Sequence, residues 1–170
     1  ILATGGVEAQ TSAYGYGSSP LILTQSELER RLNAGDLDAG RLRNVVLIQC
    51  VGSREAPRDY CSRVCCQTTL KHARRLQDLN PDLGIFVFYR DMMSYGFAEA
   101  HFTEARRRGV KFIAYTPEAK PRVAPADGRV TVEAHEPVLG REVTIAADLV
   151  VLATGVVPRL PAPLAEGFGA

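Results

Sequence analysis

Four cysteines are the residues most able to do chemistry in this sequence, and all of them fall within seventeen residues. They are Cys50, Cys61, Cys65 and Cys66. Clustered cysteines in an otherwise ordinary chain favour metal or redox chemistry in a reducing compartment over a disulfide framework. A zinc site would need all four sulfurs to converge, with Cys50 reaching across a loop. Free structural thiols are the other alternative.

Helical geometry separates the three later cysteines. Cys61 and Cys65 are four residues apart, and we place both on the flank of a helix, with Cys61 near its start, where the helix dipole favours the thiolate. Cys66 projects with Leu70 and Ala73 onto the apolar face and is predicted to be a buried core residue. Because there is no Cys-x-x-Cys run, this stretch should not enclose an iron–sulfur cluster by itself in the usual way.

The cysteines lie between a predicted buried strand, Val45 to Ile48, and an amphipathic helix that ends near Leu79. Strand, loop and helix in this order form the first half of a βαβ unit, whose ligand usually sits where the strand ends. A dinucleotide would need a Gly-x-Gly-x-x-Gly turn there. Here Gly52, followed by Ser53, is the only glycine in the turn. We therefore predict that NADH and NADPH bind weakly or not at all.

The remaining elements predict an α/β fold with short links. Apolar strands alternate with helices and then give way to alternating apolar and polar residues, which predicts a parallel sheet followed by an antiparallel meander. We expect a loop over 7–20, a helix begun by Ser26 and ended by Gly35, strands at Ile85–Tyr89 and Val110–Tyr115 around a helix at Phe97–Arg108, the meander over Val130–Ile145, and a buried strand within Asp148–Gly155.

Composition sets the limits on function. The chain has 170 residues, 46% apolar and 23% charged, with a net charge of +1, which argues against a dedicated nucleic-acid surface. No apolar run approaches the ~18 residues of a membrane span. Since Ile1 begins within a strand-like segment, we expect a piece of a longer polypeptide without a signal peptide. Together with the free cysteines, these features predict a cytoplasmic protein.

The histidines and tyrosines give little evidence about function. We expect His72 to be solvated, and neither His101 nor His135 is spaced for hydrolysis with a serine or cysteine. The segment Tyr14–Gly17 could pack on a flavin, although loop packing is the simpler role.

Several motifs carry a family resemblance. ILATGG at 1–6 and VLATGV at 151–156 bracket the chain, and between them stand YGYG at 14–17, IQCVGSR at 48–54, YCSRVCC at 60–66 and FYRDMMSYG at 88–96. The bracketing segments resemble those of two-dinucleotide flavoprotein disulfide reductases such as thioredoxin reductase. Together, the motifs closely resemble the family formed by the A subunits of heterodisulfide reductase.

The resemblance implies a Rossmann-like FAD/NAD(P)-binding fold that belongs to a larger oxidoreductase. It implies a connection from an FAD domain over 1–40, an NAD(P)-binding-like domain over 41–147, and a return strand to the FAD domain over 148–170. It also implies FAD and [4Fe–4S] clusters in the full-length parent, with Cys61 or Cys65 as a cluster ligand. The implied cofactor-binding residues are Ala3, Thr4, Gly5, Gly52, Ser53, Arg90, Ala153, Thr154 and Gly155.

Two roles remain open for Arg90, and several remain open for the whole chain. Arg90 follows the second strand, where NADP enzymes of this type place basic residues, but an ion pair with Asp91 explains it equally well.

The chain could pass electrons between flavin, clusters, ferredoxin-like domains of the same parent and other subunits of a redox complex. Alternatively, it could be a non-catalytic docking module, or an NAD(P)H-binding domain that feeds the flavin. The fragment alone should be inactive.

Overall fold

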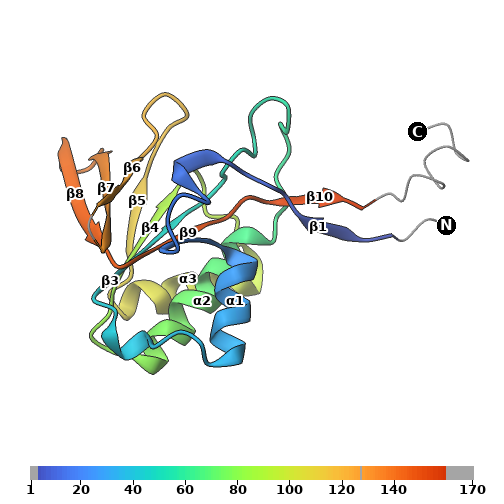
Figure 1. Cartoon of the computed structure of the whole chain (residues 1–170). Coiled ribbons are helices and arrows are strands. Elements are labelled where there is room, and N and C mark those ends of the chain that lie inside the picture. Colours follow the sequence, from blue (N-terminus) through green and yellow to red (C-terminus); the bar gives the residue numbers. More distant parts are fainter. Residues whose placement is uncertain (1–3, 127, 160–170) are drawn as a thin grey trace, which may run out of the picture.

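A five-stranded parallel sheet forms the centre of the fold. The computed structural model describes residues 4–126 and 128–159. All neighbouring strands of the central sheet are parallel, which confirms the predicted α/β architecture (Figure 1). In spatial order, the strands are β2 (Ile22–Thr24), β9 (Leu149–Leu152), β3 (Asn44–Ile48), β4 (Gly84–Tyr89) and β5 (Lys111–Ala114).

Each face of this sheet is covered by a different layer. Val45 and Leu47 pack toward the helices, whereas Val46 and Ile48 pack toward the meander. Because both faces are covered, the central strands read as continuous apolar runs. The helices lie together on one side of the sheet (Figure 1), and the predicted meander is confirmed as a separate antiparallel sheet. The helices are α1 (Gln25–Ala34), α2 (Cys65–Leu79) and α3 (Glu99–Arg107), and the meander strands are β6 (Arg122–Ala126), β7 (Arg129–Glu136) and β8 (Arg141–Ala147).

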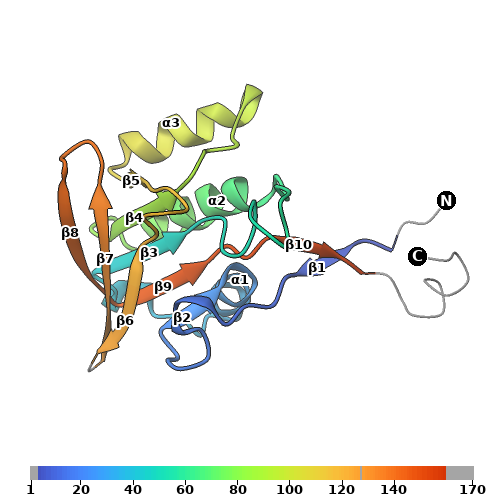
Figure 2. The same ribbon diagram turned by 90° about the horizontal axis from the view of Figure 1, so that it is seen from above.

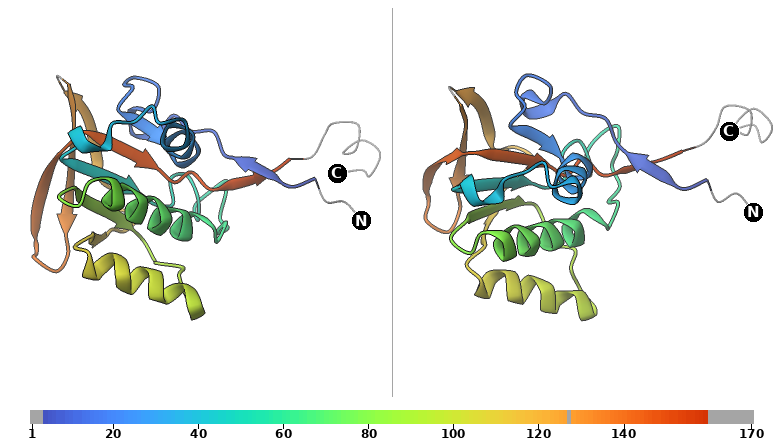
Figure 3. Two further views of the ribbon diagram at one scale, coloured as in Figure 1. Left: turned by 90° about the horizontal axis from the view of Figure 1, so that it is seen from below. Right: turned by 60° about the horizontal axis from the view of Figure 1, so that its bottom comes forward.

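A two-stranded antiparallel ribbon projects from this body. It consists of β1 (Gly6–Glu8) and β10 (Val156–Pro158), which run side by side in every view (Figures 1, 2 and 3). Residues 6–8 and 156–158, which adjoin the two bracketing segments, are therefore neighbours in space. Three short 3-10 turns complete the fold: η1 (Ala13–Gly15), η2 (Ala39–Arg41) and η3 (Gly96–Ala98).

The start of α1 differs from the prediction. Thr24, not Ser26, caps the helix: its hydroxyl accepts from the Glu27 amide, and the Glu27 carboxylate accepts from the Thr24 amide at 2.8 Å. This reciprocal pair is a capping box. The prediction was wrong because Thr24 also ends β2, a short strand that the sequence pattern did not reveal. Gly35 ends the helix as predicted, in the left-handed region with φ 75°.

Helix α2 begins at Cys65, so the prediction that Cys61 lies near the helix start was wrong. Arg63 has φ 61°, a left-handed conformation that a right-handed helix does not accommodate. The turn at Arg63 keeps Cys61 in the preceding loop. Cys66, Leu70 and Ala73 are buried together on one face of α2, as predicted.

His72 is fully buried, which corrects the expectation that it is solvated. Its Nε2 lies 2.6 Å from a carboxylate oxygen of Glu29 on α1. Burial lowers the pKa of His72, and the Glu29 carboxylate opposes this shift. The sequence suggested one apolar stripe on α2, but this helix packs against α1 and α3 as well as the sheet, so a flanking residue is buried too. His101 and His135 are exposed.

The meander is longer than the expected range of Val130–Ile145, because β6 begins at Arg122 and β8 ends at Ala147. The starts of two other elements shift by one or two residues, as helix and strand ends commonly do. The third helix starts at Glu99, after a 3-10 turn, and the following strand starts at Lys111. Within the described residues, none of the helices has both the length and the apolar character that crossing a membrane requires.

Candidate functional site

The loop between β3 and α2, residues 49–64, carries Cys50 and Cys61 and leads into Cys65 and Cys66. Three of its residues other than glycine adopt left-handed backbone conformations, Cys50 with φ 57°, Arg54 with φ 61° and Arg63 with φ 61°. Each such residue costs about 1–3 kcal/mol, and conformations of this kind cluster at functional sites. The concentration of strain in one loop marks it as the candidate site.

Hydrogen bonds hold this loop against the end of β9. The Ser53 hydroxyl and the Arg58 guanidinium both donate to the Thr154 carbonyl, at 3.3 and 3.1 Å. Farther along, the Tyr60 hydroxyl donates to the Val156 carbonyl at 3.2 Å, and the Val156 amide donates to the Ser62 hydroxyl at 2.8 Å. The loop is therefore joined to the strand that enters the β1–β10 ribbon.

Some of the predicted cofactor-binding residues come together here. Gly52 and Ser53 lie beside Ala153, Thr154 and Gly155, because the Val51 amide donates to the Ala153 carbonyl at 3.0 Å. Gly155 has φ 79°, and a Cβ at this position would lie 2.6 Å from the Ser53 hydroxyl oxygen. A side chain at Gly155 would therefore push the loop away.

The first bracketing segment lies elsewhere. The Gly5 carbonyl accepts from the Arg159 amide at 3.1 Å, at the end of the ribbon that is farther from Gly155. Thr4 precedes it, and Ala3 falls outside the described residues. The structure therefore separates Gly5 from the group around Gly52.

All four thiols line one small cavity, together with Ser53, Arg54, Ser62, Arg63, Asp91 and Met93. The cavity volume is about 10 Å³, which is room for roughly one water molecule. All four cysteines are free. Cys66 is only 5% exposed, and its sulfur lies 3.7 Å from the Asp91 carbonyl oxygen. The core residue Cys66 thus faces the same space as the loop cysteines.

Burial favours the neutral form of three thiols of this cavity, Cys50, Cys65 and Cys66. It raises the pKa of Cys65 to about 11, and it also raises the pKa values of Cys50 and Cys66. The helix N-terminus does not overcome this desolvation at Cys65, the first residue of α2. A metal centre bound here would have to displace the thiol protons, so its binding would be pH-dependent.

Arg54 brings a positive charge to the cavity. Its Nη2 lies 2.7 Å from Asp91 Oδ2, so the ion pair predicted as an alternative for Arg90 is formed by Arg54. The Arg54 side chain also lies close enough to Cys50 to oppose the burial-driven rise of the Cys50 pKa. However, its Nη1 is enclosed by protein and has no hydrogen-bond partner of normal geometry among the described residues.

The donor set is better suited to a cluster than to a single ion. Among the described residues, no group of three or more histidine, cysteine or acidic side chains is placed to hold a metal ion. A zinc ion needs four sulfurs about 2.3 Å from one centre. An iron–sulfur cluster takes the same four thiolates around a larger core. The loop carrying Cys61 would have to move outward to admit such a core.

A cleft beside the ends of β3, β4 and β5 occupies the usual nucleotide position, with a volume of about 660 Å³. Arg90, which was predicted to bind a cofactor there, donates to the carbonyls of Ser53 and Arg54 at 3.4 and 3.0 Å. A Cβ on Gly52 would lie 2.6 Å from an Arg58 nitrogen. The protein's own arginines therefore occupy the space around the turn.

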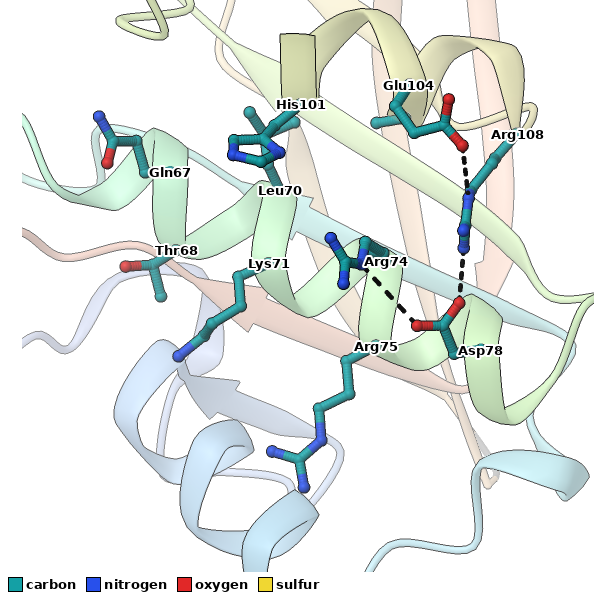
Figure 4. A pocket seen from close by; sticks show the side chains of 11 residues that line it. Gln67, Thr68, Leu70, Lys71, Arg74, Arg75, Asp78, His101, Glu104 and Arg108 are labelled. Atoms are coloured by element: carbon teal, nitrogen blue, oxygen red, sulfur yellow. Dashed lines mark hydrogen bonds and ion pairs between the residues drawn. The ribbon is translucent and has the colours of Figure 1, made fainter. Parts of the chain in front are cut away.

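The groove between α2 and α3 is of similar size, about 590 Å³, but its charges are already paired (Figure 4). Arg108 contacts Asp78 at 2.6 Å and Glu104 at 3.0 Å, and Arg74 lies 3.9 Å from Asp78. Exposed pairs of this kind stabilise a protein by little. Since no cysteine lines this groove, we place the candidate site at the thiols.

Comparison with known proteins gives this site a family context. No family model matches the chain. The iron-sulfur A subunit of the CoB–CoM heterodisulfide reductase of Methanocaldococcus jannaschii is 38% identical over 170 residues, covering 92% of this chain and 26% of that protein. The A subunit of the H2:CoB-CoM heterodisulfide,ferredoxin reductase of Methanothermobacter marburgensis is 34% identical over 158 residues, covering 85% and 24%.

The chain is homologous to a segment of the heterodisulfide reductase A subunit. This confirms the resemblance predicted from the motifs. The chain spans about a quarter of the length of these heterodisulfide reductase relatives. A FAD-dependent pyridine nucleotide-disulphide oxidoreductase from Desulfovibrio vulgaris shares the fold, with a TM-score of 0.58 and 19% identity over 98% of this chain and 37% of its own. This likeness confirms the predicted Rossmann-type fold.

Two features of the candidate site were not predicted from the sequence. Spacing indicated that Cys61 and Cys65 belong together, but it did not bring Cys50 and Cys66 to them. Arg54 was not singled out, although its place between Cys50 and Cys61 was a signal, because a cation among cysteines favours redox or metal chemistry.

Proposed function

We propose that this chain is the NAD(P)-like segment of a flavin-dependent, iron–sulfur-linked oxidoreductase, and that its cysteine cavity binds a [4Fe–4S] cluster. The observation that carries the proposal is the arrangement of four free thiols around one cavity. The name of the M. jannaschii relative, an iron-sulfur subunit, supports it. Such a cluster exchanges single electrons, and flavin couples them to two-electron chemistry.

The chain's own residues would prepare and hold this cluster. Cys61 and Cys65, the ligands expected from the sequence, would be joined by Cys50 from the start of the loop and Cys66 from the first turn of α2. Each thiol would release a proton on binding, and at Cys50, Cys65 and Cys66 this release would work against pKa values raised by burial. The hydrogen bonds to Thr154 and Val156 keep the loop attached to β9 and β10.

We further propose that the two bracketing segments connect this chain to the rest of the parent protein. We assign 1–40 and 148–170 as connections to an FAD domain and 41–147 as the NAD(P)-like domain. Strands β2 and β9 lie within the two connections, although they share one sheet with β3. Ala3, Thr4, Gly5, Ala153, Thr154 and Gly155 would lie toward the FAD. The chain would exchange electrons with ferredoxin-like domains of the same parent and with other subunits of a redox complex. We do not expect it to bind nucleic acid. The free thiols favour a cytoplasmic location.

Anaerobic reconstitution of the chain with iron and sulfide tests the cluster. We expect a brown protein with about four irons and four sulfides per chain, and an electron paramagnetic resonance signal after reduction with dithionite. A colourless protein that retains no iron would refute cluster binding by this segment. A colourless protein that binds one zinc ion per chain would replace it with the zinc site.

Nicotinamide binding should be weak or absent. The turn after Ile48 keeps only Gly52, and Arg58 and Arg90 fill the space around it. In addition, α2 begins at Cys65, well beyond the end of β3, so its free amides are not available at the strand end as a pyrophosphate requires. Calorimetric titration with NADH and NADPH should detect no binding. A dissociation constant of about 1 μM, near −8 kcal/mol, would contradict this prediction.

A further inference from the structure

Arg54 brings to the cysteine cavity a donor, Nη1, without a hydrogen-bond partner of normal geometry, although its side chain lies close to the Cys50 thiol. Its side chain lines the same space as all four thiols and is 27% exposed as a whole. However, Nη1 is enclosed, and none of the described residues accepts a hydrogen bond of normal geometry from it. Buried polar groups are normally satisfied, so an enclosed donor without a partner calls for an explanation.

The surrounding protein holds Arg54 in this orientation. Its Nη2 lies 2.7 Å from Asp91 Oδ2. Its backbone carbonyl accepts from Arg90 at 3.0 Å, and its amide donates to the Tyr60 carbonyl at 3.3 Å. These contacts maintain the left-handed conformation at φ 61°. A strained residue that is fixed on several sides is preorganised for a particular contact.

We propose that Arg54 donates a hydrogen bond from Nη1 to a sulfur of the [4Fe–4S] cluster and raises its reduction potential. This inference rests on the cluster binding proposed above. Accepting one electron makes the cluster and its four thiolates more negative, so a neighbouring cation stabilises the reduced form more than the oxidised form. Net charge and hydrogen bonds to the sulfurs are among the factors that set these potentials.

The partner carboxylate does not cancel this effect. The Asp91 side chain is 60% exposed, so water screens its charge, whereas Nη1 of Arg54 is enclosed beside the thiols. Screening weakens exposed charges much more than buried ones. Arg54 therefore acts as a positioning residue with a net positive influence on the cluster.

The test compares Arg54→Gln, Arg54→Lys and Arg63→Gln in the reconstituted chain. Midpoint potentials are measured by dithionite titration followed by electron paramagnetic resonance. We expect Arg54→Gln to lower the equilibrium constant for one-electron reduction about tenfold, or about 59 mV. Arg54→Lys should show a smaller decrease, because it keeps the charge without the planar fork. Arg63→Gln removes the same charge from an exposed residue that also lines the cavity, and should lower the potential less than Arg54→Gln does.

The outcomes separate this inference from the proposed function. If the wild-type chain takes up no cluster, cluster binding itself fails. If the wild type and Arg54→Gln carry the same cluster at the same potential, the role of Arg54 is refuted while cluster binding stands. If Arg54→Gln takes up no cluster, Arg54→Lys decides. This variant keeps the positive charge but loses the planar fork, and a potential equal to or above that of the wild type would overturn the inference.

Discussion

Replacing Cys65 with serine should leave the protein folded but unable to retain its iron–sulfur cluster. The Cys65 sulfur is one of four that line the cavity, and an alcohol does not replace a thiolate as a ligand for iron at neutral pH. Because cluster binding depends on the complete ligand set, we expect the variant to retain less than about a tenth of the wild-type iron after desalting. In the full-length parent, the flavin should remain bound.

Val64→Ser is the matched control for this variant. It introduces the same side chain at the adjacent position, which is 50% exposed and does not line the cavity. Its iron content and visible spectrum should equal those of the wild type. If Cys65→Ser retained four irons with an unchanged spectrum, Cys65 would not be a ligand, and the remaining three thiols would have to find a fourth ligand elsewhere.

Replacing Thr69 with valine should produce a large loss of stability without a change in shape. The Thr69 hydroxyl is fully buried and accepts hydrogen bonds from the side-chain amides of Gln25 at 2.6 Å and Gln49 at 2.5 Å. Valine fills the same volume but accepts neither bond. Gln25 keeps its bond to the Cys65 carbonyl at 3.0 Å, whereas the Gln49 amide loses its partner in the core.

The expected decrease in the free energy of unfolding is about 1–3 kcal/mol, the cost of one buried donor, the Gln49 amide, left without an acceptor. Urea unfolding monitored by circular dichroism measures it. Thr68→Val is the control, because Thr68 is a half-buried neighbour on the same turn whose hydroxyl donates only to the Val64 carbonyl. A loss below about 0.5 kcal/mol for Thr69→Val would show that another group, such as a water molecule, takes over its role.

Hydrophobic patterning was sufficient to predict the sheet. The strands at Val45, Ile85 and Leu149 are buried on both faces, so they read as apolar runs, and the meander shows the alternation of a sheet with one covered face. Strand β2 was missed because it has only three residues and pairs with β9, more than a hundred residues later. A segment this short carries no periodicity, and its strand identity comes from tertiary pairing.

The candidate site was only partly predictable because its geometry depends on loop conformation. The left-handed residues Cys50, Arg54 and Arg63 have no glycine signal in the sequence, yet they turn the loop so that four thiols meet. Helical phase correctly placed Cys66 on the buried face of α2. It failed for Cys61, because the helix begins after the turn at Arg63.

The β1–β10 ribbon gives this protein the geometry of a domain that could be inserted into another protein. The chain enters through Gly6–Glu8 and leaves through Val156–Pro158, and these segments are hydrogen-bonded neighbours, only about 4.8 Å apart. The sheet, the helices and the thiols all lie between these two segments in the chain. A two-residue hairpin turn would bridge the same gap, so excising the sheet, helices and thiols together would leave the paired strands in register. Conversely, the residues between β1 and β10 could be inserted at the tip of an exposed β-hairpin in another protein.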